Sequence, residues 1–309
     1  MQAVLSSKTA GEHLSGLSEA TRVRLEAILF DASFDGAIRS DVVEDVLRLE
    51  NGAMALRQFM VAMLPVAGLY SAPATSDFRV GAVCSGENGS VYFGANLELP
   101  RAALGFTVHA EQSAIGNAFS HGEKAVGALA VTHAPCGHCR QFLNELEGGS
   151  TLPVILGDDL ETELSSLLPL AFGPADLGVD GGMLAHGETR LTEVSGAGGP
   201  LVEAALQAAE RSYAPYTSAY SGMALQLRDG SIVTGSYLEN AAHNPSLIPV
   251  LAAIDRLRFR SESYSEISAA VLVGMEDAKI GHEEITRVIL ESVAPRAGLR
   301  VLVARPDEP

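Results

Sequence analysis

The spacing of hydrophobic positions changes near residue 70. From about residue 17 to residue 64, Leu, Ile and Val recur every three or four residues, which is the spacing of one face of a helix. From Phe78 onward, two β-type runs, FRVGAVCS and SVYFGANLEL, are separated by the turn-forming stretch GENG, which predicts an antiparallel hairpin. We therefore predict a small helical N-terminal domain over residues 1–68, followed by a domain built on a sheet.

The rest of the first half alternates predicted helices and strands. The pattern predicts a helix over about 109–119, a buried strand in AVGALAVTH, a helix from Cys136 through Leu146 and a strand near LPVIL. Such alternation indicates an α/β fold in which helices cover a sheet. The stretch SGAGGP at 195–200 is typical of a linker, and a predicted helix, LVEAALQAAERSY, follows it. We place the two larger domains at 69–194 and 195–309.

An internal repeat relates these two domains. Three pairs of positions match, namely Gly81 with Gly222, Gly94 with Gly235, and Glu98 with Glu239. The repeat indicates a duplicated domain. The positions of His109 and Glu111 fall on Ile248 and Val250, and no cysteine follows Cys139. The second copy is therefore not expected to hold the same metal.

Composition and charge narrow the class of protein. The chain has 309 residues, 47% of them hydrophobic, with no apolar run of transmembrane length and no secretory signal at its start. We expect a cytoplasmic protein. The formal net charge is −17, and no cluster of Lys and Arg stands out that would neutralise a phosphate backbone. Nucleic acid and membranes are therefore not expected partners.

Three candidate metal ligands stand at the starts of two predicted helices. Cys136 and Cys139 form a CxxC turn, where the first-turn amides and the positive end of the helix dipole favour thiolate. With His109 they would give zinc three ligands, one fewer than a tetrahedral site needs, which is typical of catalytic zinc. His133 and His138 are further candidate ligands, but helix direction should turn His138 away from the two cysteines.

Glu111 stands two residues after His109, a spacing that puts side chains about 200° apart on an ideal helix. Both can act on one metal if it lies off the helix end, with His109 as ligand and Glu111 as the shuttle that moves protons between water and substrate. HxE followed by PCxxC is the signature of zinc deaminases.

Two alternatives compete with this interpretation. A structural zinc module would have no use for an acid beside an open coordination position and would normally supply a fourth protein ligand. The second alternative is a deaminase that acts on a nucleotide or on an adenine in RNA. The third cysteine, Cys84, lies within a predicted strand and is expected to be a small core residue.

Several motifs together resemble the long, duplicated, homodimeric form of cytidine deaminase. They are FRVGA, YFGANLE, TVHAEQSAI, PCGHCRQFLNEL, AFGP at 171–174 and GSYLENAAHNP at 235–245. The resemblance covers essentially the whole chain. It implies a three-layer α/β/α domain duplicated in tandem after a helical N-terminal domain, one Zn²⁺ per chain without an organic cofactor, and a homodimer. It also implies hydrolytic deamination of cytidine and deoxycytidine, as used in pyrimidine salvage.

The same resemblance implies roles for individual residues. The metal ligands are His109, Cys136 and Cys139, and the proton shuttle is Glu111. The expected substrate contacts are Asn96 and Glu98 on the ribose hydroxyls, Phe78 on the pyrimidine ring, backbone groups of Ala110 and Ala134 on the base edge, and Phe172 as a closing aromatic. His243 stands where the long form has a second aromatic that closes the partner's pocket.

Overall fold

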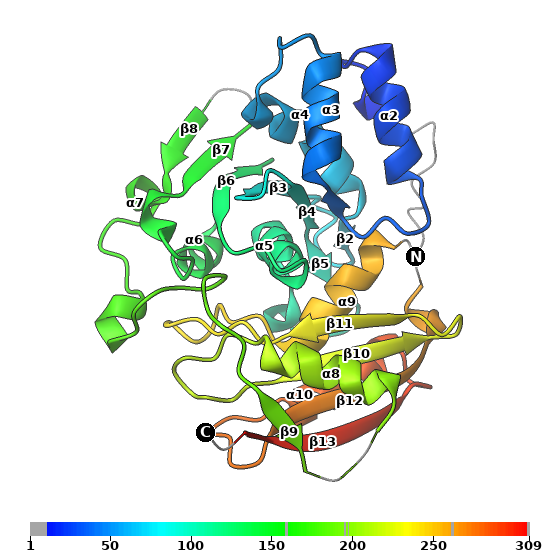
Figure 1. Ribbon diagram of the computed structural model, residues 1–309, viewed down its shortest axis with the longest axis vertical. Coiled ribbons are helices and arrows are strands. Elements are labelled where there is room, and N and C mark those ends of the chain that lie inside the picture. Colours follow the sequence, from blue (N-terminus) through cyan, green and yellow to red (C-terminus); the bar gives the residue numbers. More distant parts are fainter. Residues whose placement is uncertain (1–10, 158–159, 195, 197, 261–262, 308–309) are drawn as a thin grey trace.

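A computed structural model describes residues 11–157, 160–194, 196, 198–260 and 263–307. Figure 1 shows the first half of the chain above the second half, with helix α9 (Pro249–Phe259) between the two sheets. Within the described ranges no helix is long and apolar enough to cross a membrane. The mixed arrangement of sheets and helices confirms the predicted α/β class.

The first half is built on a six-stranded sheet. Its strands lie in the order β1 (Ala37–Ile38), β4 (Val91–Ala95), β3 (Gly81–Gly86), β6 (Val126–Val131), β7 (Pro153–Leu156) and β8 (Leu160–Glu163). The predicted hairpin is β3 and β4, which pair antiparallel, whereas β6 and β7 pair parallel. A separate pair of short parallel strands, β2 (Ala72–Pro73) and β5 (Leu97–Glu98), lies beside this sheet.

The second half repeats this plan with five strands. They lie in the order β11 (Ile232–Ser236), β10 (Gly222–Leu227), β12 (Ile267–Met275), β13 (Gly298–Pro306) and β9 (Leu191–Glu193). The hairpin of β10 and β11 and the parallel pair of β12 and β13 match those of the first sheet. The pairing therefore confirms the duplication.

Each sheet lies between helices. In the first half, α4 (Leu56–Leu69) covers one face and α5 (Ala110–Ser120) the other; in the second half, α8 (Pro200–Glu210) and α9 take these places. Three further helices of these two halves are α6 (Gly137–Leu143), α7 (Leu164–Leu167) and α10 (Glu283–Val293). The three-layer α/β/α arrangement is thus present twice.

The matched glycines lie where these helices touch the sheets. A Cβ atom at Gly94 would come within 2.1 Å of the Ala110 carbonyl oxygen, and one at Gly235 within 2.3 Å of the Pro249 carbonyl oxygen. Gly81 and Gly222 face α4 and α8 in the same way. Because no side chain separates backbone from backbone, each helix rests directly on its strand.

The N-terminal region is helical, as predicted, with α2 (Glu19–Leu29) and α3 (Ser40–Leu49) at the top of Figure 1. It also supplies β1, which pairs with β4 as an edge strand of the first sheet. The proposed limits at residues 69 and 195 stay a prediction. Helix α4, from the segment 1–68, packs on β3, and β9, from the segment 69–194, pairs with β13.

One helix ends earlier than its sequence predicts. The expected helix from Cys136 through Leu146 is α6, which ends at Leu143. Beyond it, the backbone of residues 145–147 bonds to Met183 instead of continuing the helix, with Met183 N donating to Glu145 O at 2.8 Å. Part of the predicted linker, residues 195 and 197, lies outside the described residues.

Substitution of Gly235 tests the contact between helix and sheet. Gly235→Ala should lower the free energy of unfolding by about 2–3 kcal/mol, because its Cβ would overlap the backbone of α9. Gly298→Ala is the control, since nothing lies within 4 Å of its Cβ, and it should change stability by less than about 0.5 kcal/mol. Urea unfolding of both variants measures the difference, and equal stabilities would contradict this role of Gly235.

Candidate metal centre and catalytic site

Two helices begin at the candidate site. His109 is the N-cap of α5 and Cys136 is the N-cap of α6, and both residues have extended backbone. The two helices pack against each other, so these starts lie together. A ligand at the N-cap and an acid in the first turn can face one point off the helix end, which explains the spacing of His109 and Glu111.

The three predicted ligands form one cluster. His109 Nδ1 lies 3.5 Å from Cys136 Sγ and 3.3 Å from Cys139 Sγ, and the two sulfurs are 3.6 Å apart. Across the described part of the chain, this is the group of His, Cys, Asp and Glu side chains whose ligand atoms converge, within 4.8 Å of one another. One imidazole nitrogen and two sulfurs are a donor set that fits zinc, with one tetrahedral position left for another ligand.

The charges of these groups depend on one another. Hydrogen bonds from Cys139 and His109 lower the pKa of Cys136 to about 3. The contact with Cys136, together with burial, raises the pKa of Cys139, and the contact between His109 and the Cys136 sulfur raises the pKa of the imidazole. Cys136 is therefore the readier thiolate of the pair, and a cation between the sulfurs would favour the deprotonated form of both.

Glu111 lies beside this cluster in the first turn of α5. Its side chain is only 4% exposed, and burial raises the pKa of its carboxyl above the usual range, although contacts with Cys139 and His109 oppose that shift. A carboxyl group beside the cluster is in a position to exchange protons with a group bound there.

The two other candidate histidines lie outside the cluster. The His138 ring is 5.3 Å from the His109 ring, centroid to centroid, and burial lowers its pKa. The His133 ring lies 4.6 Å from the ring of Phe78. The structure thus places His133 against the aromatic that is expected to pack on the pyrimidine.

Asn96 is held by three hydrogen bonds within the protein. Its side-chain oxygen accepts from Val80 N at 2.9 Å and from the Ser71 hydroxyl, and its amide donates to Phe78 O at 2.9 Å. Because a backbone N–H can only donate, these partners fix which end of the amide faces Val80. One of the two amide hydrogens has no bond in this set and is available to another acceptor.

Glu98 is held by a short loop. Its carboxylate accepts from Thr75 N at 2.7 Å, Ser76 N at 2.8 Å and Ser76 Oγ at 2.5 Å. Partial burial alone would raise the pKa of Glu98, but these bonds, first that of the Ser76 hydroxyl, hold it below its usual range. The group is therefore a carboxylate at neutral pH, with an acceptor position to spare.

The remaining expected contacts are spread around the site. Ala110 is the first residue of α5, and Ala134 lies in the loop between β6 and Cys136. Phe172 is 45% exposed, and its carbonyl accepts from Gln141 on α6 at 2.7 Å, which holds the AFGP loop beside that helix. His243 lines a cavity of about 570 Å³ that is formed mostly by the second half and bordered by Gly105 and Phe106 of the first.

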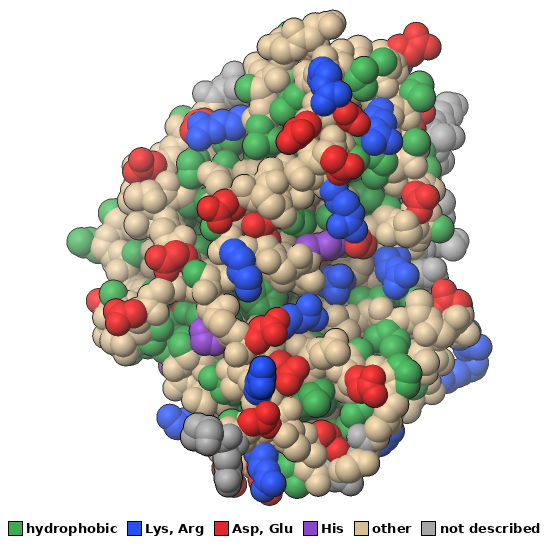
Figure 2. Space-filling view, in the orientation of Figure 1, with side chains coloured by type: hydrophobic (Ala, Val, Ile, Leu, Met, Phe, Trp, Pro, Cys, Tyr) green, Lys and Arg blue, Asp and Glu red, His purple; other side chains and the backbone are tan. Residues whose placement is uncertain are grey.

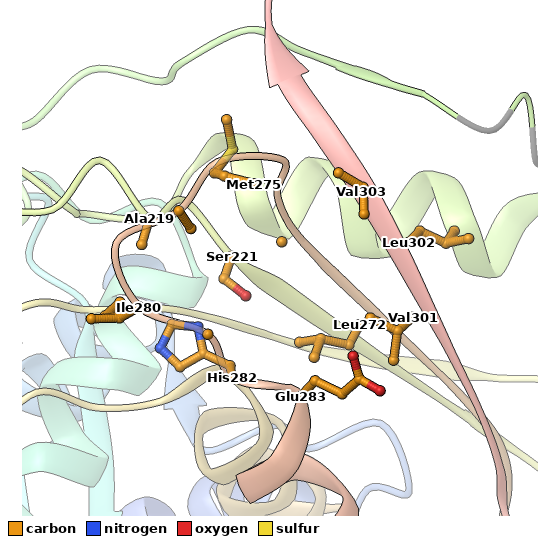
Figure 3. A pocket seen from close by; sticks show the side chains of 13 residues that line it. Ala219, Ser221, Leu272, Met275, Ile280, His282, Glu283, Val301, Leu302 and Val303 are labelled. Carbon is orange, nitrogen blue, oxygen red and sulfur yellow. The ribbon is translucent and has the colours of Figure 1, made fainter.

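This cavity occupies the equivalent site of the second half. Ile248 is the N-cap of α9 and His282 the N-cap of α10, the places that His109 and Cys136 take in the first half. Three residues after His282, Ile285 replaces Cys139. Figure 3 shows the His282 imidazole beside Ile280, in a second cavity of about 160 Å³. Apolar side chains thus replace two of the three metal donors, as the repeat predicts.

Sequence reasoning missed the buried charges that join the two halves. Glu145 accepts from the hydroxyl of Tyr213 at 2.9 Å and from Ala241 N at 2.9 Å. Arg258, on α9, donates to backbone carbonyls of the first half. The available signal was a set of three charged residues, Asp255, Arg256 and Arg258, in the otherwise apolar run PVLAAIDRLRF, in which Asp255 and Arg258 are spaced by three.

A His–Cys–Cys cluster with a buried acid two residues after the histidine defines the class of zinc-dependent deaminases. Comparison with known protein families gives the same class. The family described as "Cytidine and deoxycytidylate deaminase zinc-binding region" matches this chain twice, at residues 54–152 and 164–287.

Named relatives extend over most of the chain. A cytidine deaminase of Vibrio cholerae is 41% identical over 281 residues, which are 90% of this chain and 93% of that protein. One of Photobacterium profundum is 40% identical over 283 residues, 91% of this chain and 94% of that protein. A solved cytidine deaminase of Burkholderia pseudomallei is 31% identical with a TM-score of 0.35, covering 38% of this chain and 100% of its own. The chain belongs to the cytidine and deoxycytidylate deaminase family.

Metal analysis tests the ligand assignment. Purified protein should contain close to one zinc per chain, and Cys136→Ala should lose it because two donors hold zinc too weakly. Cys84→Ala is the matched control, since Cys84 is buried in β3 away from the cluster, and it should keep its zinc. Two zinc ions per chain would show that the second half also binds metal.

Proposed function

We propose that the protein hydrolyses cytidine and deoxycytidine to uridine and deoxyuridine, with one Zn²⁺ per chain bound by His109, Cys136 and Cys139. The observation that carries the proposal is the buried carboxyl of Glu111 beside a three-donor metal cluster. A structural zinc site would have a fourth protein ligand and no need of this acid. The named relatives, which are cytidine deaminases, support the choice of substrate.

The reaction replaces the amino group of the base with oxygen. Zinc, when bound, supplies a Lewis acid that makes water nucleophilic at neutral pH. Glu111 takes a proton from the attacking water and delivers it to N3 of the pyrimidine. Glu111 then takes the remaining proton of the hydroxyl added at C4 and passes it to the amino group. The bond from C4 to that nitrogen breaks, ammonia leaves, and the added oxygen becomes the carbonyl of the product. The raised pKa of Glu111 suits a group that must both accept and give protons.

The first-half residues around the cluster hold the nucleoside. The free amide hydrogen of Asn96 and the carboxylate of Glu98 take the sugar hydroxyls, and the exposed ring of Phe78 packs on the base. Backbone groups of Ala110 and Ala134 read the base edge. In this arrangement the sugar is bound by fixed polar groups, and carbon C4 of the base faces the metal cluster.

We also propose a homodimer in which each site is closed by the other chain. Phe172 and His243 are the closing residues, and the exposure of the Phe172 ring suits a contact outside its own chain. His243 offers an imidazole in place of an aromatic ring and can still stack or accept a hydrogen bond. Closure excludes water and strengthens the interactions of Glu111 with developing charge.

Small molecules are the expected partners. Figure 2 shows Lys and Arg side chains interspersed with Asp and Glu over the visible face, and the whole chain carries a formal charge of −17. Such a surface does not attract a phosphate backbone. The absence of nucleic-acid partners and a cytoplasmic location stay predictions.

Glu111→Gln tests the function directly. The variant should keep one zinc per chain and its thermal stability but lose turnover by on the order of 10³-fold, because proton transfers at both N3 and the amine fail. The assay is the loss of cytidine absorbance, with and without a zinc chelator. Glu163→Gln, at an exposed position of β8, is the control and should keep full activity. Near-normal turnover by Glu111→Gln would remove Glu111 from the mechanism.

Cytidine monophosphate tests the sugar contact. Like charges a few Å apart repel by about 2–3 kcal/mol at intermediate dielectric, less where salt screens them, so kcat/KM should be roughly 10–100-fold lower for the monophosphate than for cytidine. Glu98→Gln should narrow that ratio by removing one carboxylate. Equal efficiency of the unmodified enzyme on both substrates would contradict the assignment of Glu98.

A further inference from the structure

Helix α9 belongs to the second half but ends inside the first. Its start rests on Gly235 of the second sheet, whereas its last residue, Phe259, is buried with its ring 5.1 Å from that of Tyr70. Figure 1 shows this helix crossing from one half toward the other. Side chains near its C-terminal end can therefore reach the catalytic half.

Arg258 makes this connection with four of its five N–H donors. One terminal nitrogen donates to Tyr70 O at 2.6 Å and to Asn96 O at 3.0 Å. The other donates to Ala95 O at 2.8 Å and to the Asp255 carboxylate. Arg258 is 7% exposed and Asp255 only 2%, so these bonds form away from water.

Two of the three carbonyls, those of Ala95 and Asn96, lie at the segment that carries the proposed sugar contacts, and the third, that of Tyr70, lies at the end of α4. Ala95 is the last residue of β4, Asn96 follows it, and Glu98 ends β5 two residues later. The Asn96 side chain is already bonded to Val80 and Phe78, so it cannot turn to compensate for a shift of its own backbone without losing those bonds. A shift of the carbonyls at 95 and 96 would therefore move both groups that face the sugar.

We propose that Arg258, from the half without metal ligands, is a positioning residue that holds Asn96 and Glu98 in place for the sugar hydroxyls of the substrate. This inference rests on the proposed nucleoside deaminase function. It gives the second half a part in substrate binding within its own chain, in addition to any closure across a dimer.

The chemistry of the Arg258 side chain supports a positioning role. A planar guanidinium can bond three carbonyls and a carboxylate at fixed angles, whereas a lysine ammonium has three donors on one nitrogen. A buried ion pair contributes little net stability because desolvation offsets its attraction. The bonds of Arg258 to three carbonyls are therefore better explained by the position of this segment than by stability alone.

Arg258→Lys on the zinc-loaded enzyme tests the inference. With cytidine, kcat/KM should fall about tenfold, mostly through KM, because a tenfold change corresponds to one displaced hydrogen bond of about 1.4 kcal/mol. With dideoxycytidine, which lacks both ring hydroxyls of the sugar, kcat/KM should change less than about twofold. A purely structural role would lower both values together.

Two further variants complete the test. Arg256→Lys is the matched control on the same helix, since Arg256 donates to Thr234 O within the second half, and it should leave both substrates unaffected. Asp255→Asn keeps an acceptor for Arg258, so kcat/KM should fall in the same substrate-dependent way but to a smaller degree. This variant takes the place of Arg258→Lys if Arg258→Lys does not fold.

The outcomes separate the two proposals. If the unmodified protein deaminates cytidine but Arg258→Lys, or Asp255→Asn in its place, loses equal activity on both substrates at full zinc content, this inference is wrong and the proposed function stands. If the unmodified, zinc-loaded protein does not deaminate cytidine, the proposed function is wrong and this inference falls with it.

Discussion

The direct contact of helix backbone with strand backbone determines where the functional side chains lie. At Gly94 the carbonyl of Ala110 approaches so closely that no side chain fits between them. This contact sets the height at which α5 begins, and therefore the positions of His109 at its N-cap and Glu111 in its first turn. The equivalent contact at Gly235 sets the position of α9, which carries Arg258 to the carbonyl of Asn96.

Local spacing made the metal site predictable. The HxE and CxxC motifs each lie within one turn, so their geometry follows from where two helices begin, and the matched glycines indicated the duplicated fold. The end of α6 and the contacts of Arg258 were not predictable in this way. They depend on Met183 and on Ala95, which lie about 40 and 160 residues away in sequence, and such pairings follow from tertiary packing rather than from local preference.

The second half shows which hydrogen bonds of the site stabilise the fold independently of any chemistry. Its metal donors are replaced by Ile248, His282 and Ile285, yet Glu239 still accepts from Tyr216 N at 2.8 Å and from Thr217 N and Oγ1 at 3.2 and 2.7 Å. These bonds repeat those of Glu98. The carboxylate therefore stabilises its loop whether or not chemistry takes place, and the same stabilised group in the first half is the one proposed to contact a sugar.

The apolar core has a consequence for how the chain folds. One continuous cluster of buried side chains includes Leu97 and Val108 of the first half with Leu238 and Leu257 of the second. Neither half can open without exposing apolar surface of the other, so we expect the two halves to unfold together. Duplication has thus produced two copies of a domain that share one apolar core, so a substitution that loosens the second copy is expected to lower the stability of the catalytic copy as well.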